Sequence, residues 1–267
     1  GRFVASRIED HRRRDASKRI AVLYRTNAQS RVFEESLRRL RIDYNIVGGF
    51  SFYERAEVKD IVAYLKLALN PADDIALLRV INTPPRGIGK SSLDELQAVA
   101  RRSEGSLWSA IAAVADGEPA ALTPRARNAI TSFRGTIEKL RNKAEALAGT
   151  DKPVSETVIA AIDDSGYSLM LRTENTEEAE GRLENLEELV NAAVDYDKSP
   201  EGGLRDFIDH AALTADTDRY DGNAGVTLMT VHSAKGLEFP VVFIVGLEDG
   251  VFPHSRSVND AKELEEE

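Results

Sequence analysis

Two segments with strand-like apolar runs lie near opposite ends of this 267-residue chain, and the long stretch between them has no convincing strand pattern. The first segment covers residues 20–49 and the second covers residues 226–246. The run of Val, Ile and Phe at residues 240–246 is typical of a strand that is buried on both faces of a parallel sheet. The pattern therefore predicts an α/β fold whose partial parallel-sheet domain is interrupted by a large all-helical insertion.

The first segment predicts a β-α-β unit. Residues 20–24 form a short apolar strand, and residues 44–49 form a second strand that ends in a glycine pair. Between them, Val32, Phe33, Leu37 and Leu40 recur at helical spacing, after Thr26 or Asn27 as the expected N-cap. This helix is long enough for a right-handed crossover between parallel strands. An amphipathic helix is expected before the unit, over residues 3–14.

The middle of the chain predicts helices alone, with apolar stripes or capping signals over residues 58–69, 75–81, 92–100, 107–114, 124–147, 154–162, 179–196 and 204–214. Pro71 suits the first turn of the second helix. Ser92 and Glu95 form a capping box that would open the third. The expected domains are therefore residues 1–53 and 221–267, as two segments of one α/β domain that is incomplete at its C-terminus, and residues 54–220 as the insertion.

Composition limits the classes of partner. The net charge of −10 does not attract nucleic acid to the whole chain, so DNA binding must come from local basic or backbone-donor sites. The absence of cysteine excludes disulfides and cysteine-bound metal, and the four scattered histidines predict no metal site. No apolar stretch is long enough to span a membrane, and no export signal opens the sequence. A cytoplasmic protein without a membrane partner is expected.

A polar loop separates the strands expected at 226–229 and 240–246. It carries a hydroxyl, an imidazole, an ammonium group, a glycine and a carboxylate, from Thr230, His232, Lys235, Gly236 and Glu238. Because α/β domains bind ligands in loops at the ends of parallel strands, this loop is a candidate binding site. The alternative is an ordinary polar turn.

A second candidate site lies between two predicted helices, at residues 82–89. Gly87 and Gly89 flank Ile88 and leave backbone N–H groups exposed, while the next helix starts nearby with its own free N–H groups. Arg86 and Lys90 add positive charge, so a nucleic-acid phosphate is the natural ligand. A helix C-cap and turn explains the glycines equally well. A Walker loop is excluded, because its first glycine would fall at Pro84.

Five stretches of the chain, in this order, resemble the second half of UvrD/PcrA/Rep-type superfamily 1 DNA helicases. They are residues 24–31 (YRTNAQSR), 48–60 (GGFSFYERAEVKD), 82–89 (NTPPRGIG), 182–189 (RLENLEEL) and 230–239 (TVHSAKGLEF), and residues 251–256 (VFPHSR) fit as well. The resemblance implies most of a second RecA-like motor domain with its helical subdomain inserted. In such enzymes ATP and Mg²⁺ lie between two motor domains, and single-stranded DNA crosses both.

The resemblance also implies roles for particular residues. It assigns contacts with single-stranded DNA to Arg25, Asn27, Thr230, His232 and Lys235. It assigns the nucleotide ribose to Glu238, with Gly236 beside it. It assigns duplex DNA to two loops, one with Arg86, Gly87, Ile88, Gly89 and Lys90 and the other with Ser165 and Gly166. No catalytic or metal-binding residue is implied within this chain.

The implied protein is an ATP-dependent 3′–5′ DNA helicase of DNA repair or replication, placed in the bacterial cytoplasm at the nucleoid. Its partners would be single-stranded DNA, the junction with duplex DNA, and the first motor domain of the same protein. That domain carries the Walker loop and the magnesium-binding acids, so this chain alone is expected neither to hydrolyse ATP nor to unwind DNA. Two alternatives stay open: a non-catalytic DNA-binding module, and the helicase portion of a helicase–nuclease.

Overall fold

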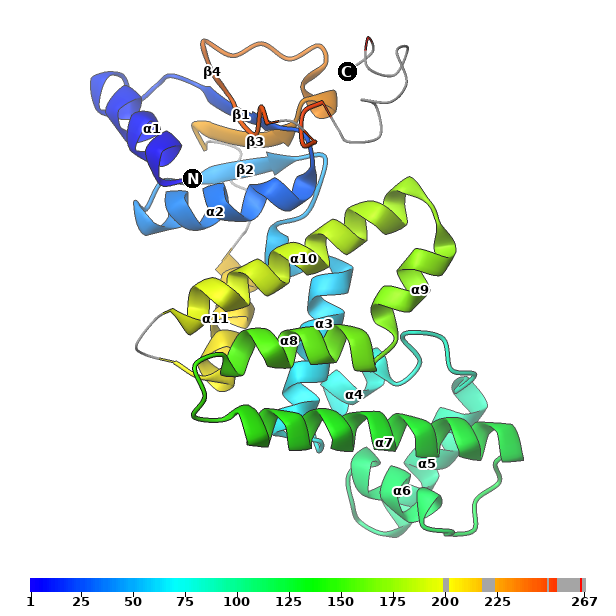
Figure 1. Ribbon diagram of the computed structural model, residues 1–267. Helices are drawn as coiled ribbons and strands as arrows, with labels where there is room; N and C mark the ends of the chain where they lie inside the picture. Colours follow the sequence, from blue (N-terminus) through cyan, green and yellow to red (C-terminus); the bar gives the residue numbers. More distant parts are fainter. Residues whose placement is uncertain (199–201, 218–223, 249, 254–264, 266–267) are drawn as a thin grey trace. The chain divides into compact units, whose positions relative to one another are not determined.

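The computed structural model describes residues 1–198, 202–217, 224–248, 250–253 and 265, with the backbone alone for 215–217 (Figure 1). The chain forms two compact units, one of residues 1–55 and 215–267 and the other of residues 56–214. Within the described residues, every strand belongs to the first unit, and the second contains only helices and their connections. The predicted class, an α/β fold with a parallel sheet and an all-helical insertion, is confirmed.

The first unit is built on a four-stranded parallel sheet. Its elements are α1 (Arg2–Arg14), β1 (Ile20–Tyr24), η1 (Asn27–Gln29), α2 (Ser30–Arg39), β2 (Tyr44–Val47), η2 (Phe52–Glu54), β3 (Val226–Thr230), η3 (His232–Ala234) and β4 (Val241–Ile244). The strand order is β2-β3-β1-β4. Ile20 of β1 is in register with Val226 of β3 and with Val241 of β4. The late strand β3 thus lies between the two early strands.

One face of this sheet forms the core with α1 and α2. Alternate residues of the strands point to that face, as the period of two in a strand requires. They pack with Ile8 of α1 and with Phe33 and Leu37 of α2, and all ten members of this cluster are at most 8% exposed. Ile8, Phe33 and Leu37 are thus buried as their apolar spacing indicated, whereas Phe3 of α1 is 74% exposed and Leu40, at the end of α2, is 38% exposed.

The expectation that the strand at 240–246 is buried on both faces is wrong. Val241 and Phe243 pack partly against the core, whereas Val242 is 46% exposed and Ile244 is 53% exposed. The physical reason is the place of β4 in the sheet, because it is the last strand and pairs only with β1. Among the described residues of this unit, no layer covers its outer face.

The second unit is helical. It contains α3 (Ala56–Leu69), α4 (Asp74–Val80), α5 (Lys90–Arg102), α6 (Leu107–Ala115), α7 (Pro124–Leu147), α8 (Pro153–Asp164), α9 (Tyr167–Glu174), α10 (Glu177–Asp197) and most of α11 (Leu204–Thr217). Helix α3 packs against α4, α7, α8 and α10, and ten of its fourteen residues are buried. A helix that is buried nearly all round is the expected centre of such a bundle.

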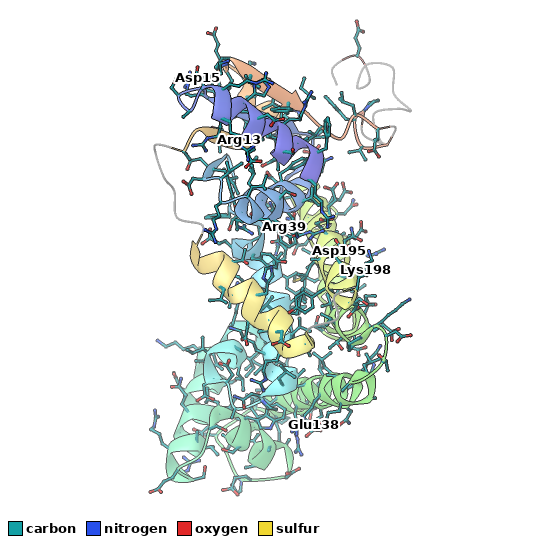
Figure 2. All side chains as sticks on the ribbon, turned by 90° about the vertical axis from the view of Figure 1, so that its left-hand side faces the viewer. Arg13, Asp15, Arg39, Glu138, Asp195 and Lys198 are labelled. Atoms are coloured by element: carbon teal, nitrogen blue, oxygen red, sulfur yellow. The ribbon has the colours of Figure 1, made fainter. Side chains whose placement is uncertain are left out.

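The surface of the helical unit carries exposed charged side chains. Figure 2 shows Glu138 on α7, and Asp195 and Lys198 at the end of α10, in such positions. Lys198 and Asp195 form an ion pair of 3.0 Å between side chains that are 69% and 59% exposed. Exposed pairs of this kind add little stability.

Helix starts and one short helix differ from the sequence predictions. Asp73 caps α4 by accepting from the N–H of Ala76 at 3.0 Å, so Pro71 precedes the helix and is not in its first turn. Helix α5 begins at Lys90 after an extended Gly89, so Ser92 is helical and the predicted capping box is wrong. Helix α9 was not predicted. It is short and lies between two residues with left-handed backbones, so it has no long apolar stripe.

Candidate nucleic-acid interface

Three loops meet at the carboxyl-terminal edge of the sheet. They follow β1, β2 and β3, and parallel strands bring such loops to one edge. At Gly48, where φ is +79°, a Cβ atom would lie 2.6 Å from Oγ of Ser233. At Gly49 a Cβ atom would lie 3.5 Å from Oδ1 of Asn27. The glycine pair therefore lets the β2 loop touch both of the other loops, and Gly48 is required for the closer approach.

The loop after β3 is closed by its own hydroxyl groups. Oγ1 of Thr230 lies 2.9 Å from Oγ of Ser233 and accepts from the N–H of Ser233 at 3.2 Å. The N–H of Val231 donates to the carbonyl of Tyr24 at 2.9 Å, which fixes the loop to β1. The side chains of His232 and Lys235 are thus exposed on a loop whose backbone is fixed by its hydrogen bond to β1.

Glu238 does not lie with these groups. Its backbone carbonyl accepts from Nη2 of Arg19 at 3.2 Å, and Arg19 directly precedes β1. Glu238 therefore lies toward the amino-terminal edge of the sheet, while Thr230 ends β3 at the opposite edge. Glu238 and Gly236 are exposed, and the described residues supply no hydrogen-bond donor to the Glu238 carboxylate. The sequence had placed both groups in one loop, and the structure separates them along it.

The turn after β1 contains Arg25 and Asn27. Thr26 and Gln29 form a capping box for η1, and Oε1 of Gln29 accepts from the N–H groups of Arg25 at 2.9 Å and Thr26 at 3.1 Å. Thr26, one of the two expected N-caps, thus caps the 3₁₀ turn η1, whereas the N-cap of α2 itself is Gln29. Asn27 is exposed, and its carbonyl accepts from Nη2 of Arg55 at 2.8 Å.

A buried polar network, which the sequence analysis missed, fixes this turn. Arg55 also donates to Oγ of Ser30 at 2.6 Å, and Ser30 donates to the fully buried carboxylate of Glu34. Glu34 further accepts from Arg38 at 3.0 Å and from the N–H of Phe52 at 3.2 Å. Burial raises the pKa of Glu34 above its usual range. The available signal was polar Ser30 and Glu34, four residues apart, beside the apolar stripe of α2.

In the helical unit, the loop at 82–89 is closed by Asn82. Its Oδ1 accepts from the N–H of Arg86 at 2.8 Å and from the N–H of Ile88 at 3.2 Å. Ile88 is buried, and Gly87 has a φ of +79°. Four exposed residues, Gly87, Gly89, Lys90 and Ser91, have backbone N–H groups for which the described residues provide no acceptor. These four N–H groups are therefore open at the loop and at the start of α5.

Arg86 points into the unit and joins two loops. Its guanidinium donates to the carbonyls of Val80 at 3.1 Å, Pro84 at 3.0 Å and Ser165 at 2.9 Å, and to the hydroxyl of Tyr64 at 2.7 Å. It also lies 5.4 Å from the ring centroid of Phe133. Arg86 therefore holds the loop at 82–89 against the loop at Ser165, which brings together the two loops that the resemblance assigned to duplex DNA.

The second of these loops is anchored by Tyr167. Ser165 is buried, and Gly166 has a φ of +79° with open space around its Cα atom. The hydroxyl of Tyr167 donates to Asp60 at 2.7 Å and accepts from Arg182 at 2.8 Å. An open groove of about 410 Å³ lies between the two loops, lined by Pro84, Pro85, Gly166, Leu169, Met170, Thr173 and Glu174.

Arg125 is a further cation at the first loop. Its Nε lies 3.8 Å from the position that a Cβ atom would take at Gly87, and its side chain is exposed. The first turn of α7 brings it there, since α7 begins at Pro124. No pattern in the sequence indicates this contact, because the two residues belong to separate elements.

Two searches of the described residues found nothing. No helix in them is long and apolar enough to cross a membrane. No group of three or more histidine, aspartate or glutamate side chains in them could hold a metal ion.

Comparison with known proteins gives a consistent result. Residues 1–267 match the model of the family described as the UvrD-like helicase C-terminal domain. The chain is 44% identical to the ATP-dependent DNA helicase PcrA of Bacillus subtilis (strain 168) over 279 residues, which cover 100% of this chain and 36% of that protein. It is 42% identical to PcrA of Staphylococcus epidermidis and 40% identical to PcrA of Staphylococcus aureus (strain Mu50), each over 271 residues that cover 99% of this chain and 36% of the relative. The chain thus spans little more than a third of the length of these relatives.

Proposed function

Because this chain belongs to the UvrD-like helicase C-terminal domain family, we propose that it is part of an ATP-dependent 3′–5′ DNA helicase of DNA repair or replication. In this proposal, residues 1–53 and 221–267 belong to the second motor domain, and residues 54–220 form its inserted subdomain. The observation that carries the proposal is the meeting of three loops at one sheet edge, where the glycine pair joins the Asn27 turn to the Thr230 loop. A cytoplasmic location at the nucleoid belongs to the same proposal.

The sheet edge contacts the backbone of single-stranded DNA. His232 and Lys235 are exposed and donate to phosphate oxygens, as do Arg25 and the amide of Asn27. The hydroxyl of Thr230 is hydrogen-bonded to that of Ser233, so Thr230 shapes the loop and also offers a hydroxyl group to the single-stranded DNA. Contacts with phosphates fix the position of the strand without reading its sequence, which suits an enzyme that moves along DNA.

The nucleotide contact is at the other end of the same loop. The exposed carboxylate of Glu238 accepts a hydrogen bond from a ribose hydroxyl, with Gly236 beside it. Since the loop has DNA contacts near β3 and the ribose contact near β4, a shift of one ligand changes the position of the other. The described residues fit no Mg²⁺ site. The partner in this proposal is the first motor domain of the same protein, which supplies the phosphate loop and the metal ligands.

The helical unit grips duplex DNA. The free N–H groups of Gly87, Gly89, Lys90 and Ser91 face a phosphate, and Arg125 adds charge beside them. Ile88 is the apolar residue that anchors this loop in the core. Arg86 supports this contact indirectly, because its guanidinium donates to the Ser165 carbonyl and so links the loop of Ser165 and Gly166 to the first loop. The two loops then act on the duplex as one rigid body.

A salt titration of DNA binding tests the proposal. Fluorescence anisotropy follows the full-length protein, and this chain alone, with a duplex that bears a 3′ single-stranded tail. We expect affinity to fall steeply with salt, and the Gly87→Asp/Gly89→Asp variant to lose at least about tenfold of its duplex affinity. The matched control is Gly117→Asp/Gly135→Asp, in which both glycines have open space around the added side chain. Equal binding by the two variants contradicts the duplex assignment.

The nucleotide assignment has a separate test. The full-length protein is expected to hydrolyse ATP faster when single-stranded DNA is added, and this chain alone is expected to show no hydrolysis. Glu238→Ala is expected to lower the DNA-stimulated rate, with Glu248→Ala as an exposed acidic control on the same unit. Unchanged stimulation in Glu238→Ala, or a robust rate from the isolated chain, would overturn this part of the proposal.

A further inference from the structure

Phe50 is an aromatic residue that the protein core does not use. Its side chain is 71% exposed, although the residues on both sides are fixed in place. Strand β2 ends three residues earlier at Val47, and Ser51, Phe52 and Tyr53 that follow are at most 4% exposed. A large apolar side chain between two anchored segments has a defined position. Phe50 is therefore held in place with its ring exposed to solvent.

The position of Phe50 is the carboxyl-terminal edge of the sheet. It directly follows Gly48, whose Cα lies against Ser233, and Gly49, whose Cα lies against Asn27. Both neighbours belong to loops that carry the polar groups described above. Phe50 is thus the aromatic residue of the β2 loop, at the meeting point of three loops that are otherwise polar.

A second exposed phenylalanine shows what is particular about this position. Phe3, on α1, is 74% exposed, and the guanidinium of Arg7 lies 5.8 Å from its ring centroid. In the described part of the chain, Phe50 has no comparable cation or ring against it. Its ring is open to a ligand.

An open aromatic ring beside phosphate-binding groups matches the chemistry of single-stranded nucleic-acid binding. Such sites combine positive groups along the backbone with aromatic rings on which bases stack, and stacking tolerates any sequence because every base has a π-face. We propose that Phe50 stacks on a base of the single-stranded DNA whose phosphates contact the adjacent loops. This inference rests on the proposed function, since it requires a strand along this edge.

The test compares aromatic and aliphatic side chains at this one position in the full-length protein. Phe50→Leu keeps an apolar side chain and removes the π-face, whereas Phe50→Trp keeps the π-face. The probes are an oligothymidylate and an oligonucleotide of the same length made of abasic sites. Anisotropy at fixed salt gives both affinities. Because Phe50 is exposed, neither substitution is expected to shift the thermal midpoint, which is checked first.

We expect Phe50→Leu to bind the oligothymidylate about 5- to 100-fold more weakly than the unsubstituted protein, and Phe50→Trp to bind it at least as well. On the abasic strand all three proteins are expected to bind alike. The salt dependence of Phe50→Leu should keep its slope, because no phosphate contact is lost. Equal affinity of Phe50→Leu and the unsubstituted protein for oligothymidylate overturns the inference. An equal loss on both probes also overturns it, since Phe50 would then contact the backbone or another protein segment.

A parallel variant separates this inference from the function beneath it. His232→Ala/Lys235→Ala removes two proposed phosphate contacts and is expected to flatten the salt dependence on both probes. If this variant weakens binding and Phe50→Leu does not, the stacking inference fails and the proposed strand path stands. If neither variant changes binding, the strand does not follow this edge, and both proposals fail together.

Discussion

The loops of the two candidate DNA-binding regions are joined in opposite ways. At the sheet edge, loops from three strands approach through the backbone, because Gly48 has no side chain to separate them from Ser233. In the helical unit, two loops are joined by a side chain, because Arg86 bonds to Ser165 across the interior. The first region depends on the absence of a side chain at Gly48, and the second depends on the partly buried guanidinium of Arg86.

The difference shows that a charged residue in a loop does not indicate a surface charge. Arg86 looks in the sequence like a phosphate ligand, yet its donors are occupied by carbonyls and a hydroxyl of its own unit. Arg125, which belongs to another helix, is the exposed cation beside Gly87. At the sheet edge the reverse holds, since the exposed His232 and Lys235 lie in the predicted loop itself.

The largest effect is expected from breaking the side-chain link. Arg86→Met leaves the carbonyls of Val80, Pro84 and Ser165 without their charged donor, and should lower the free energy of unfolding by about 2–4 kcal/mol. Urea denaturation of this chain measures it. Arg125→Met is the matched control, because that arginine is exposed, and it should stay within about 0.5 kcal/mol. If the two arginine variants have the same stability, Arg86 does not join the loops.

The backbone link is broken at a single glycine. Gly48→Ala forces a side chain into a left-handed backbone and against Ser233, at a cost of about 1–3 kcal/mol, and displaces the loops at the sheet edge. Gly49→Ala is the control, since its Cβ would make an ordinary 3.5 Å contact. We expect only the first variant to lose affinity for single-stranded DNA. The idea is wrong if the two alanines weaken binding equally.

A change of pH sharpens the comparison, because the polar network that fixes the turn after β1 contains the buried carboxyl group of Glu34. The pKa of Glu34 is raised by burial above its ordinary value near 4.5. A group whose pKa is higher in the folded than in the unfolded state stabilises the folded protein fully at pH values below its pKa in the unfolded state. This contribution is lost as the pH rises through its pKa in the folded state. Relative to Glu34→Gln, the protein should therefore lose stability as pH rises above about 4.5, by at most about 1.4 kcal/mol per pH unit. Chemical denaturation of both proteins across pH 4–8 measures this difference in stability. The difference would have the opposite sign if the attraction to Arg38 lowered the pKa of Glu34 by more than burial raises it.

The smallest effect tests how redundant the helical network is. Tyr167→Phe removes one hydroxyl, but Asp60 keeps Arg79 at 2.7 Å and Arg182 keeps Glu57 at 3.5 Å. We expect a loss of about 1 kcal/mol in unfolding free energy. Tyr167→Phe combined with Asp60→Asn gives the coupling between the two residues. A loss as large as that of Arg86→Met would mean that Tyr167, and not Arg86, fixes the second loop.

Periodicity and local signals predicted most of the fold. The β-α-β unit, the long helices and the change from α/β to all-helical pattern follow from apolar spacing, which is a local property of the sequence. The exposure of Val242 and Ile244 was not predictable, since the place of β4 at the sheet end is set by pairing and not by composition. The start of α5 was misjudged because Gly89 can adopt an extended conformation just before the helix.

The sequence named candidate residues for the site, but it did not indicate the contacts that hold them in place. Ordered motifs singled out the loops at 82–89 and 230–239, and the family model matches the chain as a whole. The roles of Arg86, Arg55 and Arg125 depend on contacts with residues that are distant in sequence, such as the bond from Arg86 to Ser165, 79 positions away. A single sequence contains no local pattern for such pairs. A single sequence likewise does not show that Phe50 is exposed.

The strand order has a consequence for synthesis of the chain. The first two strands, β1 and β2, are not hydrogen-bonded to each other, because β3 lies between them and is made only after residue 225. During translation, β1 and β2 therefore lack their common partner β3 while residues 56–214 leave the ribosome. That helical unit has its core within its own sequence. Local helical contacts also form faster than distant strand pairing. The inserted unit is therefore made and able to fold while the sheet that surrounds it in sequence is still incomplete.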